Sequence, residues 1–140
     1  MDVRATTRFR RERATVPAAR AFVRHALWQA EVTMEAAEPI VLAVAEACNN
    51  AVLHARGDVF AVTVVVDGAC CSITVSDSGG GFRPPAVPVM PAPEATGQRG
   101  LALMEMLVDR IDVASTPEGT TVVLTHTVVP ASAPPVAAER

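Results

Sequence analysis

A carboxylate and a carboxamide lie one helical turn apart within an apolar segment of this 140-residue chain. Glu46 and Asn50 are four residues apart, so on a helix their side chains stack on one face. The amide oxygen can ligate Mg²⁺, which prefers hard oxygen ligands completed by water and phosphate. The carboxylate can polarise a hydroxyl group or a water molecule. The same pair also fits the solvated polar edge of an ordinary core helix.

The second chemical motif is Asp77, which is followed by a glycine cluster at residues 79–81. A carboxylate at a strand end can accept a hydrogen bond from the exocyclic amine of adenine, and glycines let the backbone approach a flat base. An ordinary Asp-Gly loop is the alternative interpretation. A Rossmann phosphate turn fits poorly, because Pro84 and Pro85 follow and no helix begins there.

The third motif, residues 97–100, leads into an apolar segment that predicts a helix ending near Asp109. Exposed amides at a helix N-terminus, together with the helix dipole, bind phosphate well. This helix is expected to be deeply buried because it offers little polar surface, its apolar residues being Leu101, Leu103, Met104, Met106, Leu107 and Val108.

A proline-rich segment separates the second motif from the third. Its five prolines exclude a normal helix or central strand, and they are Pro84, Pro85, Pro88, Pro91 and Pro93. Irregular chain of this length inside a compact domain is typical of a functional loop or of disorder. We interpret residues 83–98 as a mobile lid over a ligand, and the Pro- and Ala-rich residues 130–140 as a disordered tail.

Two helices are expected ahead of these motifs. A half-exposed edge strand over residues 5–12 precedes a helix from Pro17 to about Ala30. The buried stripe of that helix is predicted to be Ala19, Phe22, Val23, Ala26, Leu27 and Ala30. Arg20 and Arg24 then face outward, either solvated or available to a protein partner, and Trp28 is expected to pack.

The central helix is expected to begin at Glu38-Pro39, because proline is accepted in a first helical turn. Its apolar stripe is Val41, Val44, Cys48, Val52 and Ala55. Strands follow over residues 59–66 and 69–76, joined by a hairpin turn at Asp67-Gly68. A last hairpin joins residues 111–115 to residues 120–129.

The composition of the chain limits the number of domains, the kind of partner and the cellular location. Half of the residues are hydrophobic, so one packed domain over residues 1–129 is expected. The net charge of −3 disfavours direct nucleic-acid binding. The three cysteines, Cys48, Cys70 and Cys71, lack metal-ligand spacing and fit a reducing cytoplasm. The N-terminus lacks the apolar core of a signal peptide, and no segment is expected to reach membrane-spanning length. A cytoplasmic protein is therefore predicted.

The three motifs together resemble the N, G1 and G2 boxes of the GHKL ATPases. The matching residues are Glu46-x-x-x-Asn50-Ala51-x-x-His54, Asp77-x-Gly79-x-Gly81 and Gly100-Leu101-x-Leu103-Met104, with Gly119-Thr120 near the end. The size, the order of the motifs and the helix carrying Ala19-Arg20 look most like bacterial anti-sigma factor serine kinases. The resemblance covers about residues 5–127 and departs from the family pattern at Gln98, where glycine is usual.

The resemblance implies roles for individual residues. Asn50 would ligate Mg²⁺ bridging the phosphates of ATP, and Glu46 would be the general base. Asp77 would recognise adenine with help from Thr120, while the glycines of the loop let the base lie close. The resemblance assigns the other nucleotide contacts to Gly79, Gly81, Arg99, Gly100 and Leu101. His54 matches the family pattern, but a packed histidine at the helix end is expected.

The implied fold is a two-layer α/β sandwich with helices on one face of a mixed, mainly antiparallel sheet. The implied function is an ATP-binding anti-sigma factor that sequesters a sigma factor and phosphorylates a serine of an anti-anti-sigma antagonist. Arg20 and Arg24 would bind the partner, and a homodimer is expected. The alternative is a nucleotide-binding regulatory module without phosphotransfer, which the unusual lid and Gln98 favour, whereas Glu46 and Asn50 favour the kinase.

Overall fold

The computed structural model describes residues 2–54, 57–77 and 96–128. These residues form five strands, three α-helices and one 3₁₀-helix. In chain order they are β1 (Val3–Arg10), η1 (Arg13–Thr15), α1 (Val16–Gln29), α2 (Met34–His54), β2 (Val59–Asp67), β3 (Cys70–Asp77), α3 (Thr96–Leu107), β4 (Arg110–Thr116) and β5 (Gly119–Thr127). The tail at 130–140 and most of the expected lid, residues 83–95, lie outside the described residues.

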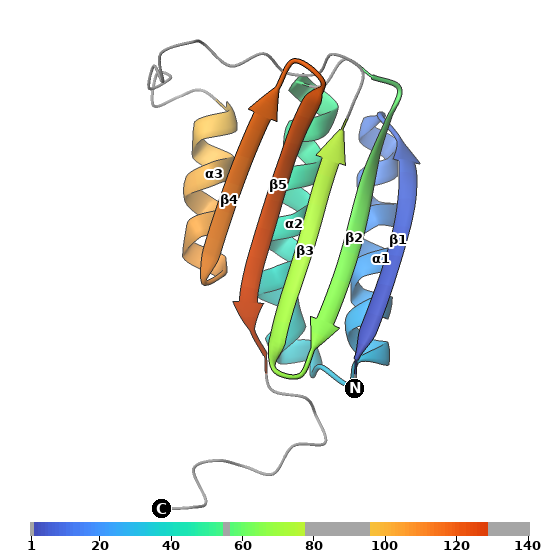
Figure 1. The fold of residues 1–140 in the computed structure, drawn as a ribbon, viewed down its shortest axis with the longest axis vertical. Helices are drawn as coiled ribbons and strands as arrows, with labels where there is room; N and C mark the ends of the chain where they lie inside the picture. Colours follow the sequence, from blue (N-terminus) through green and yellow to red (C-terminus); the bar gives the residue numbers. More distant parts are fainter. Residues whose placement is uncertain (1, 55–56, 78–95, 129–140) are drawn as a thin grey trace, which may run out of the picture.

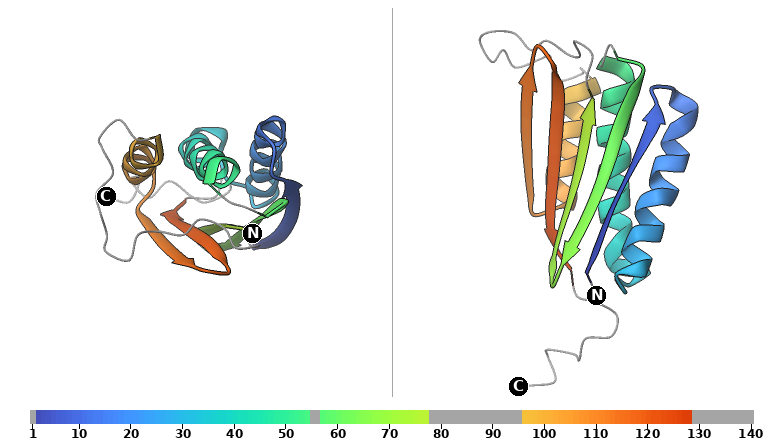
Figure 2. Two further views of the ribbon diagram at one scale, coloured as in Figure 1. Left: turned by 90° about the horizontal axis from the view of Figure 1, so that it is seen from above. Right: turned by 45° about the vertical axis from the view of Figure 1, so that its right-hand side comes forward.

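The strands form one sheet in the order β1-β2-β3-β5-β4. All three α-helices cover the same face, which gives the expected two layers (Figures 1 and 2). Every pairing among the described strands is antiparallel, so the sheet is antiparallel throughout rather than mixed. The predicted two-layer α/β sandwich is confirmed.

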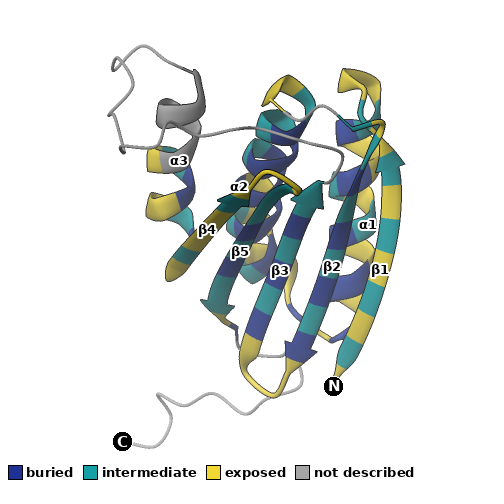
Figure 3. Cartoon of the chain, turned by 45° about the horizontal axis from the view of Figure 1, so that its top comes forward, coloured by how far each residue is buried: buried dark blue, intermediate teal, exposed yellow. Residues whose placement is uncertain are grey.

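Alternation along the strands builds the core between the layers. In β2, Phe60, Val62, Val64 and Val66 are buried and the residues between them are half-buried (Figure 3). The predicted edge strand is β1, whose Phe9 stacks on Phe60 with ring centroids 5.6 Å apart. The Asp67-Gly68 hairpin also forms, and Gly68 adopts a φ of +62°, which glycine reaches without steric cost.

Helix α2 lies between α1 and α3 and begins earlier than expected. The helix starts at Met34, where Thr33 Oγ1 accepts a hydrogen bond from the Ala36 N–H at 3.1 Å. Pro39 is therefore inside the helix, and its use as a start signal was wrong. The predicted stripe is buried at Val41, Val44 and Cys48 and half-buried at Val52, while Ala55 lies outside the described residues. Four alanines of the same helix are also buried, Ala43, Ala45, Ala47 and Ala51.

The expectation that no segment reaches membrane-spanning length was wrong for α2. This helix is long and apolar enough to cross a membrane by length and composition alone. It nevertheless packs on the sheet as the central helix of the layer, and it carries the polar residues Glu46, Asn49 and Asn50 (Figure 2). Packing against the sheet between two other helices is typical of a core helix.

Helix α1 follows the prediction except at its end. Ala19, Val23, Ala26 and Leu27 are buried as expected, whereas Phe22 is half-buried. Trp28 was expected to pack, but it is 72% exposed and stacks on the ring of His25 with a centroid separation of 5.9 Å.

Helix α3 is less buried than its composition suggested. Met104 is buried, as is Val108 just after the helix, whereas Met106 is 82% exposed. The helix lies at the margin of the layer, where one face covers the sheet and the other faces solvent. The prediction of deep burial for the whole helix was wrong.

The cysteines behave as structural residues. Cys48 and Cys71 are buried and Cys70 is exposed, and all three are free thiols. Burial raises the pKa of both the Cys48 and the Cys71 thiol to about 12. Neither buried thiol therefore forms a reactive thiolate near neutral pH.

Candidate functional site

Four elements that carry predicted site residues converge at one end of the molecule. The C-terminal ends of α2 and β3 lie there, next to the start of β5 and the N-terminus of α3 (Figure 1). The antiparallel register aligns the end of β3 with the start of β5, since Ser76 pairs with Thr121. The fold thus gathers segments that are far apart in the sequence.

Asp77 and Thr120 are in direct contact at this end. Asp77 is the last residue of β3 and follows the alternation of Ile73 and Val75, so it lies on the helix-covered side of the sheet. One of its carboxylate oxygens accepts a hydrogen bond from the Thr120 N–H at 3.3 Å. Thr120 Oγ1 in turn shares a hydrogen bond of 2.9 Å with Ser115 Oγ, which fixes its side chain. The two residues expected to recognise adenine are therefore neighbours.

Burial gives the Asp77 carboxylate an unusual electrostatic setting. Removal from water raises its pKa above the ordinary aspartate value, and the Thr120 N–H and the positive charge of Arg11 oppose that rise. A half-buried carboxylate of this kind has one oxygen held by the backbone and further lone pairs available to a ligand amine. The predicted role of Asp77 in adenine binding is compatible with this arrangement and stays a prediction.

Glu46 and Asn50 lie in the C-terminal half of α2, on the same face of the helix. Both are half-buried, although their neighbours Ala45, Ala47 and Ala51 are buried. Within the described part of the chain, no hydrogen bond or ion pair occupies either side chain. Their oxygen atoms are thus available to a ligand at the end of the helix that lies near Asp77.

The remaining predicted nucleotide contacts are only partly described. Gly79 and Gly81 lie outside the described residues. Helix α3 begins at Thr96, so the backbone of Arg99, Gly100 and Leu101 is already helical. The first four N–H groups of a helix lack intrahelical partners, and here they belong to residues 96–99. The roles assigned to these residues stay predictions.

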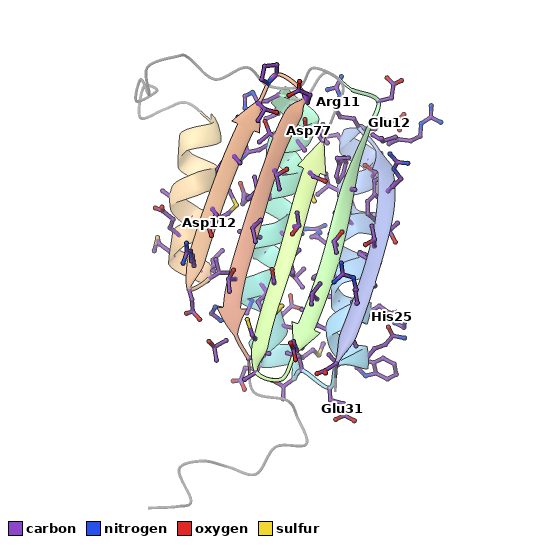
Figure 4. The ribbon with its side chains drawn as sticks, in the orientation of Figure 1. Arg11, Glu12, His25, Glu31, Asp77 and Asp112 are labelled. Carbon is purple, nitrogen blue, oxygen red and sulfur yellow. The ribbon has the colours of Figure 1, made fainter. Side chains whose placement is uncertain are left out.

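Arg11 belongs to this end of the molecule and was missed by sequence analysis. Its Nε donates to the Gly57 carbonyl oxygen at 2.6 Å and its Nη1 donates to the Val52 carbonyl oxygen at 2.7 Å. The side chains of Arg11 and Asp77 lie at the same end of the sheet (Figure 4). The only signal in the sequence is an arginine directly after the edge strand, which is too common to be informative.

The two arginines expected to bind a partner differ in their surroundings. Arg24 forms a two-pronged ion pair with Glu38 of α2, with distances of 3.0 and 3.2 Å, which raises the pKa of Arg24 and lowers the pKa of Glu38. Arg20 is half-buried rather than fully outward. Its Nε is the one buried side-chain polar atom without a hydrogen-bond partner among the described residues.

His54 does not fit its expected structural role. It was expected to pack at the end of the central helix, but its side chain is exposed at the last residue of α2. Within the described ranges, no group of three or more His, Cys, Asp or Glu side chains could hold a metal ion. The ligation of Mg²⁺ by Asn50 stays a prediction.

Comparison with known proteins identifies relatives over most of the chain. The family model of the histidine kinase-like ATPase domain matches residues 9–126. An anti-sigma F factor of Pasteuria penetrans is 35% identical over 106 residues, which cover 68% of this chain and 70% of that protein. An anti-sigma F factor of Bacillus thuringiensis (strain Al Hakam) is 33% identical over 109 residues, which cover 69% and 73%.

A solved structure of similar fold contains the RsbU and RsbW domains of a Mycobacterium tuberculosis protein. It matches with a TM-score of 0.67 at 24% identity, over 89% of this chain and 32% of that chain. The chain therefore spans about a third of that longer protein, and the likeness shows the fold.

Proposed function

The chain belongs to the histidine kinase-like ATPase domain family, within its anti-sigma factor kinase group, and we propose that it is an ATP-dependent serine kinase that sequesters a sigma factor. Nucleotide binding follows from membership of the family. The observation that carries the proposal is the contact between Asp77 and Thr120 at the end of the sheet that also receives Glu46 and Asn50. The relatives named anti-sigma F factor support a sigma factor as the partner and an anti-anti-sigma protein as the phosphorylated substrate.

In this proposal Asp77 accepts a hydrogen bond from the adenine amine, and Thr120 keeps the carboxylate in place. Mg²⁺ held by Asn50 would neutralise charge on the ATP phosphates. Glu46 lies one turn before Asn50 and accepts the proton of the attacking serine hydroxyl. Gly79, Gly81, Arg99, Gly100 and Leu101 complete the nucleotide site.

Arg20 is proposed as the main partner-binding residue. The residue is half-buried, so part of its side chain reaches the surface of α1, where a guanidinium can pair with a partner carboxylate. Arg24 contributes less in this proposal, because Glu38 already occupies its guanidinium.

A homodimer is proposed to form through the uncovered face of the sheet. The central strands present half-buried side chains there, including Thr63, Thr74 and Val123. None of the helices that the structure describes covers this face (Figure 2). A flat surface of this composition suits packing against a second copy. Sedimentation of the wild type as a dimer and of Thr74→Arg as a monomer would support this interface, whereas dimerisation of both would contradict it.

The test of the kinase is phosphotransfer to a candidate antagonist from labelled ATP with Mg²⁺. Glu46→Gln keeps the size of the side chain but removes the base, so the rate should fall roughly 10²–10⁴-fold while ADP binding persists. Glu35→Gln, which removes an exposed carboxylate from the first turn of the same helix, is the matched control and should transfer phosphate at the wild-type rate. Equal rates for wild type and Glu46→Gln would contradict the assignment and favour a binding module without phosphotransfer.

A further inference from the structure

Arg11 joins three segments that the nucleotide site needs in fixed positions. Besides the two side-chain hydrogen bonds to Val52 and Gly57, the Arg11 N–H donates to the Asp58 carbonyl oxygen at 2.8 Å. The loop after β1 is thereby tied both to the last turn of α2 and to the segment that leads into β2.

The bond to Val52 stabilises the end of α2. Val52 is among the last four residues of the helix, whose carbonyl groups lack intrahelical partners. A guanidinium there satisfies the orphan oxygen and places positive charge at the negative end of the helix dipole. Asn50 lies two residues before Val52 and directly precedes this last turn, so a movement of the turn would reach Asn50.

The charge of Arg11 also acts on Asp77. Among the charged groups of the described residues, Arg11 is the one whose positive charge lowers the pKa of the Asp77 carboxyl, while burial raises it. The hydrogen-bonding neighbour from β5 is the uncharged Thr120 N–H. An ionised Asp77 is the stronger acceptor for an amine, so the field of Arg11 favours the state that binds adenine.

We propose that Arg11 is a positioning residue of the nucleotide site, which fixes the end of α2 next to Asn50 and ties it to the segment that leads into β2. This role rests on the proposed nucleotide binding by Asp77 and Asn50. Arg11 itself touches protein carbonyl groups, so it acts through these two residues. Its planar fork serves two acceptors at once, which a lysine ammonium cannot copy with the same geometry.

The test uses the whole chain with Arg11→Gln, which removes the charge, and Arg11→Lys, which keeps it. Arg8→Gln is the matched control, because Arg8 is an exposed arginine on the adjoining strand β1. Two quantities are measured for each protein: the pKa of Asp77, from the pH dependence of its carboxyl carbon signal in NMR without nucleotide, and ADP affinity by calorimetry at pH 7. Circular dichroism confirms that each variant is folded.

For Arg11→Gln we expect the pKa of Asp77 to rise and ADP affinity to fall roughly tenfold, as for other residues that orient a binding group. Arg11→Lys should restore the pKa but not the full affinity, and Arg8→Gln should change neither. An unchanged Asp77 pKa and an ADP affinity within about twofold of wild type in folded Arg11→Gln would overturn the proposal.

The two readouts separate this proposal from the function on which it rests. If wild-type protein does not bind ADP, the proposed function fails. The titration of Asp77 needs no nucleotide and would still confirm or refute the link between Arg11 and Asp77. If wild type binds ADP and Arg11→Gln matches it in both quantities, the function stands and the role of Arg11 is wrong. If Arg11→Gln does not fold, the Arg11→Lys protein decides: ADP affinity equal to wild type would overturn the positioning role.

Discussion

The negative charge of Asp77 has opposite effects on the stability of the fold and on ligand binding. Burial raises the pKa of its carboxyl, so its ionised form is less favourable in the folded chain than in water. A carboxyl with a raised folded-state pKa contributes most to stability below its unfolded pKa and loses that contribution as pH rises through the folded value. Ionisation of this carboxyl in the folded protein therefore carries a cost, which a hydrogen bond from a ligand amine can offset.

Replacing Asp77 with asparagine should separate these demands. Asn keeps an oxygen for the Thr120 N–H but loses the charge, so ADP binding should weaken by about 1.5–3 kcal/mol, the range for a charge-assisted hydrogen bond. The melting temperature at pH 7 should stay the same or rise. Calorimetric titration and differential scanning calorimetry measure the two effects, with Asp67→Asn at the exposed hairpin as the control. Unchanged ADP affinity, or a large fall in melting temperature, would contradict this role.

The type and order of residues singled out Glu46, Asn50 and Asp77, and the family resemblance added Thr120; their roles in nucleotide binding stay predictions. Arg11 could not be predicted, since its acceptors are backbone carbonyls more than 40 residues away in sequence. Such contacts leave no pattern in residue types. The ion pair between Arg24 and Glu38 was missed for the same reason, because it needs the packing of α1 against α2.

At the scale of elements, α2 determines the geometry of the site. Small residues dominate its buried surface, which allows close approach to the sheet, and Ile40 is one of its few large buried side chains. Glu46 and Asn50 keep their positions only if this interface keeps its shape, since close-packed interiors transmit small volume changes.

Ile40→Ala should test that coupling between packing and site geometry. Ile40 is 1% exposed, so the truncation leaves a cavity and should lower the free energy of unfolding by about 2–5 kcal/mol. Leu42→Ala, on the same helix at an exposed position, should cost far less. Urea denaturation followed by circular dichroism measures both variants. Similar losses for the two would show that α2 is not packed as described.

Element boundaries show where local signals mislead. Pro39 suggested a helix start, but the helix begins at Met34, where Thr33 Oγ1 accepts a hydrogen bond from the Ala36 N–H, and it continues through the proline. Helix α3 starts at Thr96, before the glycines that suggested its N-terminus. Met106 on α3 and Trp28 on α1 are both exposed, although both are large and hydrophobic. Which face of a helix is covered depends on the packing of the other elements, and residue type alone does not predict it.

At the scale of the whole molecule, two separate surfaces are expected. The helix layer is expected to carry the partner surface, and one end of the sandwich is expected to carry the nucleotide site. Arg20→Ala should weaken binding of the sigma factor or the antagonist by about 2 kcal/mol or more, as at an interface hot spot. Arg24→Ala is the matched control on the next turn of α1 and should weaken it less, because Glu38 already pairs with Arg24.

Partner binding is measured by calorimetry or a pull-down, with ADP titration on the same proteins. Retained ADP affinity with lost partner binding in Arg20→Ala would support separate surfaces. Loss of ADP binding with retained partner binding would refute them.

The most direct test of the account compares ADP with GDP in calorimetric titrations of the wild-type chain. The Asp77 carboxylate can accept a hydrogen bond from the adenine amine, whereas guanine presents a carbonyl oxygen at that position and would meet the carboxylate with no proton between them. A site built around such a bond discriminates strongly against a ligand that lacks it. ADP should therefore bind one molecule per chain, and GDP should bind roughly 10²-fold or more weakly. Equal affinity for the two nucleotides, or no binding of ADP, would contradict the account.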